Sequence, residues 1–178
     1  MTTFLSILRG INVSGQKKIP MNELKALYEQ LNLKDCTTYI QSGNVVFKTG
    51  KPKDISKKIE QKIFDKYNFH VPVIIRTMDE MQSVLNKNPL LKEKNIDPEK
   101  LHVTYLAENP SQENIDKLNT YNYSPDLYYI TGKEIYLYCP NGYGRTKLTN
   151  TFFENKLKVT ATTRNWRTTN ELFKIMKG

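Results

Sequence analysis

Cysteine and histidine are scarce in this chain, which has only two of each among its 178 residues. Cys36 and Cys139 are far apart and lack the CxxC spacing of zinc ligands, and His70 and His102 are the only other soft ligands. We therefore expect neither a structural zinc site nor a disulfide framework. The two histidines lie in or beside strand-like runs, so we interpret them as structural residues rather than as catalytic bases.

Long hydrophobic runs are also absent. No apolar stretch approaches the roughly 20 residues that a membrane-spanning helix needs, and the chain does not open with the charged and apolar regions of a signal sequence. We therefore expect a cytoplasmic protein without a membrane partner. With 178 residues, of which 38% are hydrophobic and 25% charged, the chain is long enough to bury a core as one domain or as two small ones.

The loops that contain glycine do not match the known nucleotide-binding signatures. Gly10 and Gly15 are not followed by the Gly-Lys-Ser or Gly-Lys-Thr ending of a P-loop, and they do not form the dinucleotide fingerprint. Ser42 precedes Gly43 but lacks the glycine two positions earlier that marks a nucleophile elbow. The sequence thus indicates no cofactor and no metal, and whether the protein is an enzyme stays open.

What the chain does have is positive charge, with a formal net charge of +9. Arg9, Lys17 and Lys18 give one loop a charge of +3, and residues 140–178 contain eight Lys or Arg against two Glu, a net +6. If the fold brings these two stretches together, they form a basic patch that attracts phosphates or other anions. The alternative is that the basic side chains only keep the surface soluble.

Apolar periodicity predicts two copies of a β-α-β-β-α-β order. The first copy has helices at 20–31 and 54–67 and strands at 4–8, 37–40, 45–47 and 71–76. The second copy has helices at 111–118 and 146–157 and strands at 101–107, 127–130, 134–139 and 159–162. This order is typical of the ferredoxin-like split β-α-β fold. We predict an α+β protein of two such subdomains, formed by duplication, each an antiparallel sheet with helices on one face, plus an extra C-terminal helix.

Capping signatures and a charged segment divide this prediction into domains. Thr77 and Glu80 have the spacing of a capping box for a connecting helix, and Thr168 and Glu171 repeat that spacing for the final helix. The prolines and charges of residues 88–100 are typical of a linker. The predicted domains are a first subdomain at 1–76, a connecting helix and linker at 77–100, and a second subdomain with the C-terminal helix at 101–178.

Three stretches stand out together: 8–13 (LRGINV), 39–47 (YIQSGNVVF) and 160–168 (TATTRNWRT). Over nearly its full length the chain resembles a widespread bacterial family catalogued as domain of unknown function sixteen-ninety-seven. Where that family commonly has Gly the chain has Ser14, and where it commonly has Ser-Lys the chain has Thr146-Lys147. The resemblance implies two similar α+β subdomains, and it brings no established reaction.

Polar residues in these loops and in a later basic loop form the candidate site. The first loop follows a strand and precedes a helix, so its glycines and basic side chains either face an anion or make a tight turn. The loop at 141–147 is a second glycine-spaced basic loop before a helix. For Asn44 and Asn165, turn formation or helix capping is the alternative role. The predicted ligand- or phosphate-binding residues are Arg9, Asn12, Lys17, Gln41, Ser42, Asn44, Arg145, Lys147, Arg164 and Asn165.

We hypothesise that a basic loop patch binds a phosphate-bearing partner, either nucleic acid or nucleotide. Tyr136 and Tyr138 alternate onto one side of their strand, as base-stacking aromatics do in RNA-binding sheets. The RNA-binding signature is not present, so packing between the two half-domains is the favoured role of these tyrosines. Two alternatives come from other classes: a small-molecule enzyme with a polar Asn/Gln/Arg site at the subdomain interface, and a protein-interaction module without catalysis. The oligomeric state stays open.

Overall fold

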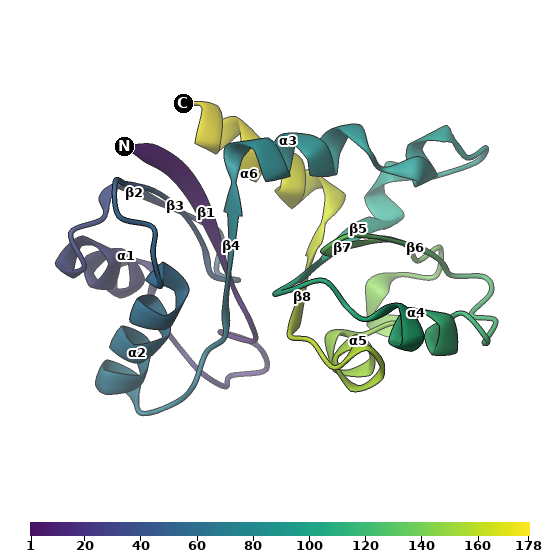
Figure 1. Ribbon diagram of the computed structural model, residues 1–178, viewed down its shortest axis with the longest axis horizontal. Helices are drawn as coiled ribbons and strands as arrows, with labels where there is room; N and C mark the ends of the chain where they lie inside the picture. Colours follow the sequence, from purple (N-terminus) through teal and green to yellow (C-terminus); the bar gives the residue numbers. More distant parts are fainter. The chain divides into compact units, whose positions relative to one another are not determined.

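The computed structural model describes residues 1–178, which divide into two compact units (Figure 1). The first unit comprises Met1–Gln82 and Leu172–Gly178, and the second comprises Ser83–Glu171. Each unit contains one four-stranded antiparallel sheet and follows the order β-α-β-β-α-β. The predicted α+β fold of two split β-α-β subdomains is therefore confirmed. The subdomain boundaries proposed at 76 and 101 stay a prediction.

The first sheet has the strand order β2-β3-β1-β4. Its strands are β1 (Thr2–Leu8), β2 (Lys34–Tyr39), β3 (Asn44–Thr49) and β4 (Val73–Thr77), and its helices are α1 (Met21–Gln30) and α2 (Ile55–Tyr67). Both helices lie on one face of the sheet, where their apolar stripes meet Phe4, Leu8 and Phe47 in a buried core (Figure 1). Because β1 pairs antiparallel with β3, the loop after β1 lies beside the β2–β3 turn.

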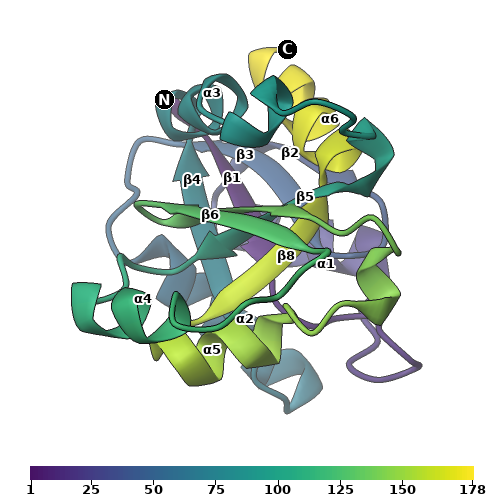
Figure 2. The ribbon, with the colours of Figure 1, turned by 90° about the vertical axis from the view of Figure 1, so that its right-hand side faces the viewer.

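The second sheet repeats this arrangement with the strand order β6-β7-β5-β8. Its strands are β5 (Leu101–Leu106), β6 (Leu127–Thr131), β7 (Glu134–Tyr138) and β8 (Ala161–Asn165). Helices α4 (Gln112–Leu118) and α5 (Asn150–Leu157) lie together on one face of this sheet (Figure 2). Leu127 of β6 pairs with Tyr138 of β7, so the loop before β6 and the loop after β7 lie at the same end of the sheet.

One further helix follows the last strand of each sheet. The boundary between the two units falls within each of these two helices. These are α3 (Met78–Asn86) and α6 (Trp166–Lys177). Short 3-10 turns are η1 (Pro89–Lys92), η2 (Pro98–Lys100) and η3 (Tyr143–Arg145). None of the helices combines the length and the hydropathy that crossing a membrane requires.

The predicted capping box is correct for α3 and wrong for α6. At α3 the Thr77 amide donates to Glu80 Oε2 at 2.8 Å and the Glu80 amide donates to Thr77 Oγ1 at 3.2 Å, as in a capping box. The helix α6 instead begins at Trp166, and Asn165 Oδ1 accepts from the Thr168 amide at 2.7 Å. The predicted Thr168/Glu171 box is therefore wrong, because the amide side chain of Asn165 caps the helix earlier.

Two other boundaries also shift. The helix predicted at 146–157 begins only at Asn150, because the Thr149 hydroxyl accepts from the Phe152 amide and caps it there. The preceding residues form η3 and an extended segment. The strand predicted at 159–162 runs from Ala161 to Asn165. The family-like residue Arg164 thus belongs to a strand and not to a loop.

The tyrosines on one side of β7 are bonded to the connecting segment of their own unit. Tyr136 is buried, and its hydroxyl donates to the carbonyl of Val84 at 3.0 Å. The hydroxyl of Tyr138 donates to the carbonyl of Asn95 at 3.5 Å. These hydroxyls therefore have partners within the second unit, and the Tyr136 ring has no exposed face on which a base can stack.

Candidate functional site

The first loop, after β1, closes on itself as a small hairpin. Asn12 N–H donates to the carbonyl of Lys17 at 3.1 Å, and Gln16 N–H donates to the carbonyl of Val13 at 2.9 Å. Ser14 and Gly15 have φ angles of 51° and 73°, which are the positive values that a two-residue hairpin turn of type I′ requires. Two of the loop's amide groups are therefore used within the loop.

The side chain of Asn12 holds this hairpin against its neighbours. Its Nδ2 donates to the carbonyls of Ile19 at 3.0 Å and Gln41 at 2.8 Å, and its Oδ1 accepts from the Ile19 amide at 2.9 Å. Lys17 Nζ donates to the carbonyl of His70 at 2.6 Å. Both amide hydrogens of Asn12 are thus occupied by backbone oxygens, and the Lys17 ammonium is already bonded.

The β2–β3 turn has a similar internal network. Asn44 is fully buried, and its Nδ2 donates to the carbonyl of Tyr39 and to Ser42 Oγ, both at 3.0 Å. The Gln41 side chain is exposed and forms no hydrogen bond. Arg9 follows β1 and is half-buried. Between this turn and the first loop lies an open depression of about 360 Å³ lined by Asn12, Gly15, Lys18, Ile19, Pro20 and Gln41.

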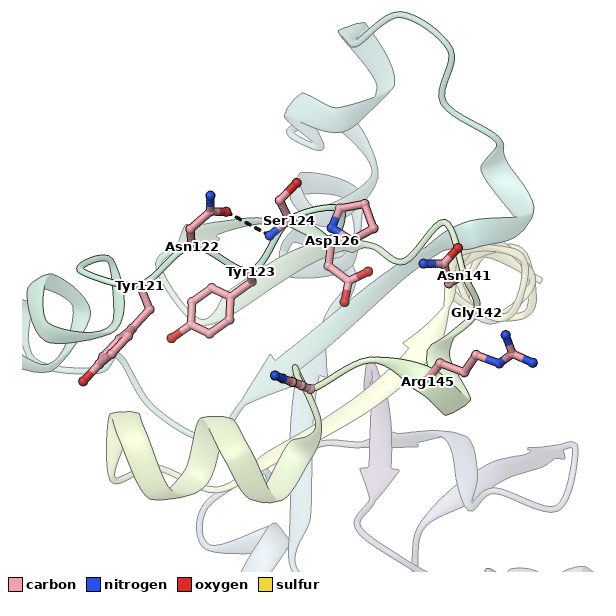
Figure 3. Close-up of a pocket in the computed structure, with 10 residues that line it drawn as sticks. Tyr121, Asn122, Tyr123, Ser124, Asp126, Asn141, Gly142 and Arg145 are labelled. Atoms are coloured by element: carbon pink, nitrogen blue, oxygen red, sulfur yellow. Dashed lines mark hydrogen bonds between the residues drawn. The ribbon is translucent and has the colours of Figure 1, made fainter.

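A larger pocket lies in the second unit, at the end of the sheet where the loop before β6 meets the loop after β7 (Figure 3). Its volume is about 430 Å³. The lining contains two tyrosines, two asparagines, two basic residues and one carboxylate. The lining residues are Tyr121, Asn122, Tyr123, Ser124, Pro125, Asp126, Asn141, Gly142, Arg145 and Lys147.

Short hydrogen bonds fix the two loops that form this pocket. Thr146 Oγ1 donates to Asp126 Oδ2 at 2.6 Å and accepts from the Leu148 amide at 3.0 Å. Asn122 Oδ1 accepts from the Ser124 amide at 2.9 Å, which shapes the first of the two loops (Figure 3). The pocket is therefore built by loops that are bonded to one another rather than by loose segments.

The charges in the pocket are mostly positive and uncompensated. Arg145 and Lys147 are exposed, and neither side chain forms an ion pair or a hydrogen bond. Asp126 is the single carboxylate of the lining, and its Oδ2 accepts the Thr146 hydroxyl. Lys156, on the last turn of α5, adds a third cation beside Tyr121. An anion entering the pocket thus meets more positive than negative charge.

The remaining two predicted residues do not line this pocket. Arg164 is 8% exposed, and its Nη1 donates to Thr162 Oγ1 at 3.0 Å and to the carbonyl of Thr163 at 2.9 Å. Burial lowers the pKa of the Arg164 guanidinium to about 10, so it stays charged at neutral pH. Asn165 caps α6. Of the ten predicted residues, the pocket brings together Arg145 and Lys147.

Histidines and cysteines do not gather into a site. No group of three or more His, Cys, Asp or Glu side chains is placed to hold a metal ion. His70 stacks on Phe64 and His102 stacks on Tyr143, with ring centroids 4.4 and 4.9 Å apart. Burial raises the pKa of the Cys36 thiol and of the Cys139 thiol to about 11, so both remain protonated at neutral pH.

Sequence reasoning missed the aromatic and acidic part of the pocket. Tyr121, Tyr123 and Asp126 were not among the predicted residues, although tyrosines are frequent between 121 and 143. That frequency is a usable signal, although the stacking hypothesis from the sequence concerns Tyr136 and Tyr138 of β7. The residues that it marks in the pocket lie instead in the loop between α4 and β6.

Comparison with known proteins decides the family. The model of a family described as a protein of unknown function (DUF1697) matches residues 1–136. The chain belongs to this family. The resemblance inferred from the sequence stretches is thus confirmed, and the DUF1697 family has no described function. The match ends before the basic loop at 141–147.

One solved structure is similar to nearly the whole chain. It is described as conserved bacterial protein SP0830 from Streptococcus pneumoniae, and it is 20% identical with a TM-score of 0.78. The similarity covers 98% of this chain and 98% of that chain, which supports the duplicated fold of this DUF1697 member. No curated protein matches the chain.

Proposed function

We propose that the pocket of the second unit binds a phosphate-bearing ligand, either a nucleotide or a nucleic acid. The observation that carries this proposal is that Arg145 and Lys147 line one pocket of about 430 Å³ without any ion pair or hydrogen bond of their own. Two cations without an ion-pair partner attract an anion, and the planar fork of Arg can bind two phosphate oxygens at once.

The neutral part of the lining supports the same ligand class. Tyr121 and Tyr123 offer aromatic surface, and the amides of Asn122 and Asn141 offer donors and acceptors. Bases bind proteins by stacking and by hydrogen bonds to their edges, while phosphates bind to cations. A pocket with all three kinds of side chain therefore fits a ligand that contains a base and a phosphate.

The other predicted residues lie outside this proposed phosphate pocket. Asn12, Lys17 and Asn44 are already bonded to backbone atoms, so a ligand has to compete with those bonds. Arg164 and Asn165 are also bonded within their own unit. We assign the phosphate to Arg145 and Lys147 and keep Arg9, Gln41 and Ser42 as candidates for a separate contact.

Fluorescence polarisation with labelled single- and double-stranded DNA and RNA tests the proposal, with unlabelled nucleotides as competitors. The R145A/K147A variant should bind at least about tenfold more weakly, because each lost charge-assisted contact contributes on the order of 1 kcal/mol. The matched control is K57A/K58A, which removes the same charge from exposed lysines of α2 in the first unit. We expect the control variant to bind within about twofold of wild type, since screening weakens distant charges.

Two results would overturn the assignment. One is equal weakening in both double variants, which would make the interaction a general charge effect. The other is no detectable binding of any nucleotide or nucleic acid by the wild-type protein at low salt.

A further inference from the structure

Tyr121 is the outermost ring of an aromatic cluster and lines the proposed phosphate pocket. It is 60% exposed, although tyrosine is a large and mostly apolar side chain. Lys156 Nζ lies 5.5 Å from the centre of the ring, which is a cation–π distance. Because the residue is largely exposed and lines the pocket, part of its ring surface is accessible to a flat ligand.

The ring next to Tyr121 in the pocket is held by several contacts. This ring is Tyr123, whose centroid lies 6.3 Å from that of Tyr121 with the planes tilted by 51°. Tyr123 in turn packs edge-on against Tyr128 at 5.6 Å and Phe152 at 5.5 Å, and its hydroxyl donates to the carbonyl of Leu118 at 3.4 Å. An aromatic platform that is held in place before a ligand arrives loses little entropy on binding.

The aromatic platform and Arg145 lie at different ends of the pocket. Tyr121 and Tyr123 lie at one end, Asn141 and Arg145 at the other, and the carboxylate of Asp126 points into the space between the two loops (Figure 3). The ligand therefore has to be elongated, with an aromatic group at one end and phosphate at the other. A short length of single-stranded nucleic acid has this form.

We infer that the pocket binds single-stranded nucleic acid, with one base stacked on Tyr121 and the backbone phosphates at Arg145 and Lys147. The inference rests on the proposed function, since it names the ligand of the same pocket. A duplex does not fit, because its bases already stack on one another and present no free face. Stacking on a tyrosine tolerates every base, since each base has a flat π-face, and the backbone is recognised by charge. The expected partner is single-stranded DNA or RNA with little preference for sequence.

The test compares a labelled single strand of about ten nucleotides, a typical site size for such proteins, with an abasic strand that has the same number of phosphates. DNA and RNA versions of the strand distinguish the two sugars, and the corresponding duplex is measured alongside. We expect the abasic strand and the duplex to bind the wild-type protein at least about fivefold more weakly than the single strand with bases, the lower end of what one stacked base contributes.

Variants of Tyr121 provide the second measurement. Y121A should weaken binding of the strand with bases by at least about fivefold and leave binding of the abasic strand unchanged. Y121F keeps the ring, and the Tyr121 hydroxyl forms no hydrogen bond, so Y121F should bind as wild type does. The matched control is Y129A, which removes an exposed tyrosine of β6 outside the pocket.

The outcomes separate the two proposals. If the strand with bases and the abasic strand bind equally, or if Y121A binds both as wild type does, the stacking inference is overturned while the phosphate pocket stands. If the duplex binds more tightly than the single strand, the ligand is double-stranded and the inference is wrong. If neither strand binds at low salt, the single-strand inference is overturned, and the proposed function falls with it only when free nucleotides also fail to bind.

Discussion

The hydroxyl of Thr146 donates a hydrogen bond to Asp126 Oδ2 at 2.6 Å, and this bond joins the two loops that line the pocket of the second unit. Asp126 therefore has two opposite effects on an anionic ligand. Its acceptor oxygen holds the loops together, and its negative charge opposes phosphate binding. The two effects can be separated, because an amide keeps an acceptor oxygen and loses the charge.

The D126N variant should bind single-stranded oligonucleotides more tightly than wild type, by up to about fivefold, the range of an exposed charge interaction. Polarisation titrations at low salt measure the change. The control is D116N on α4, which alters the net charge equally outside the pocket. If D116N tightens binding as much as D126N, the effect belongs to net charge and Asp126 does not face the ligand.

Asn12 should matter for stability and not for binding in the second unit. N12A removes three hydrogen bonds to the backbone of Ile19 and Gln41, which should cost about 2 kcal/mol or more of unfolding free energy. Asn32 also has a positive φ but no side-chain hydrogen bond, so N32A measures the backbone effect alone. Chemical denaturation of both variants gives the difference, and equal losses would show that the Asn12 network contributes nothing.

Gly43 should tolerate no side chain. A Cβ at this position would lie 2.7 Å from Ile11 Cδ1 and 2.8 Å from Leu8 Cβ, and its φ of +84° is unfavourable for other residues. Gly10 has a similar φ of +74° and open space around it. We expect G10A to cost about 1 kcal/mol of unfolding free energy and G43A at least about 1 kcal/mol more, because only G43A adds a steric clash. A smaller loss for G43A than for G10A in denaturant titrations would contradict the packing of this turn.

His102 should make the protein less stable in mild acid. Burial lowers the pKa of His102, so its protonated form is disfavoured in the folded state. The stability that this group contributes is complete above the ordinary histidine pKa of about 6.5, declines below it because the unfolded chain takes up the proton first, and is lost as the pH falls through the lowered pKa of the folded state. Melting temperatures between about pH 7.5 and 5.5 should decline less steeply in H102Q than in wild type. Identical slopes would mean that His102 is not the group responsible.

Most of the fold followed from the sequence because its signals are local. Apolar spacing marked the helices α1 and α2, and alternation marked the strands, so the duplicated order was predicted correctly. The predicted start of a helix was wrong where two residues compete to cap that helix. Thr168 has a good capping partner in Glu171, yet Asn165 lies earlier and bonds the Thr168 amide. Sequence spacing alone does not decide such a competition.

The candidate site was harder to predict, because the same polar side chain in a loop can form hydrogen bonds either to a ligand or to the protein backbone. Asn12 and Asn44 have the amides expected of a binding site, but backbone carbonyls occupy them. Arg145 and Lys147 were identified by charge, and they do line a pocket. Their neighbour Tyr121 comes from a loop some twenty residues earlier, at a distance along the chain that no local pattern reveals.

The most direct test of the central claim is the salt dependence of single-strand binding to wild type and to R145A/K147A. For single-stranded nucleic acid, a plot of log affinity against log salt concentration becomes shallower by about 0.7 for each phosphate contact that is removed. We predict that the double variant has a slope shallower by about 1.4 than wild type, as two phosphate contacts are lost. Parallel slopes would contradict the account, because Arg145 and Lys147 would then not contact phosphate.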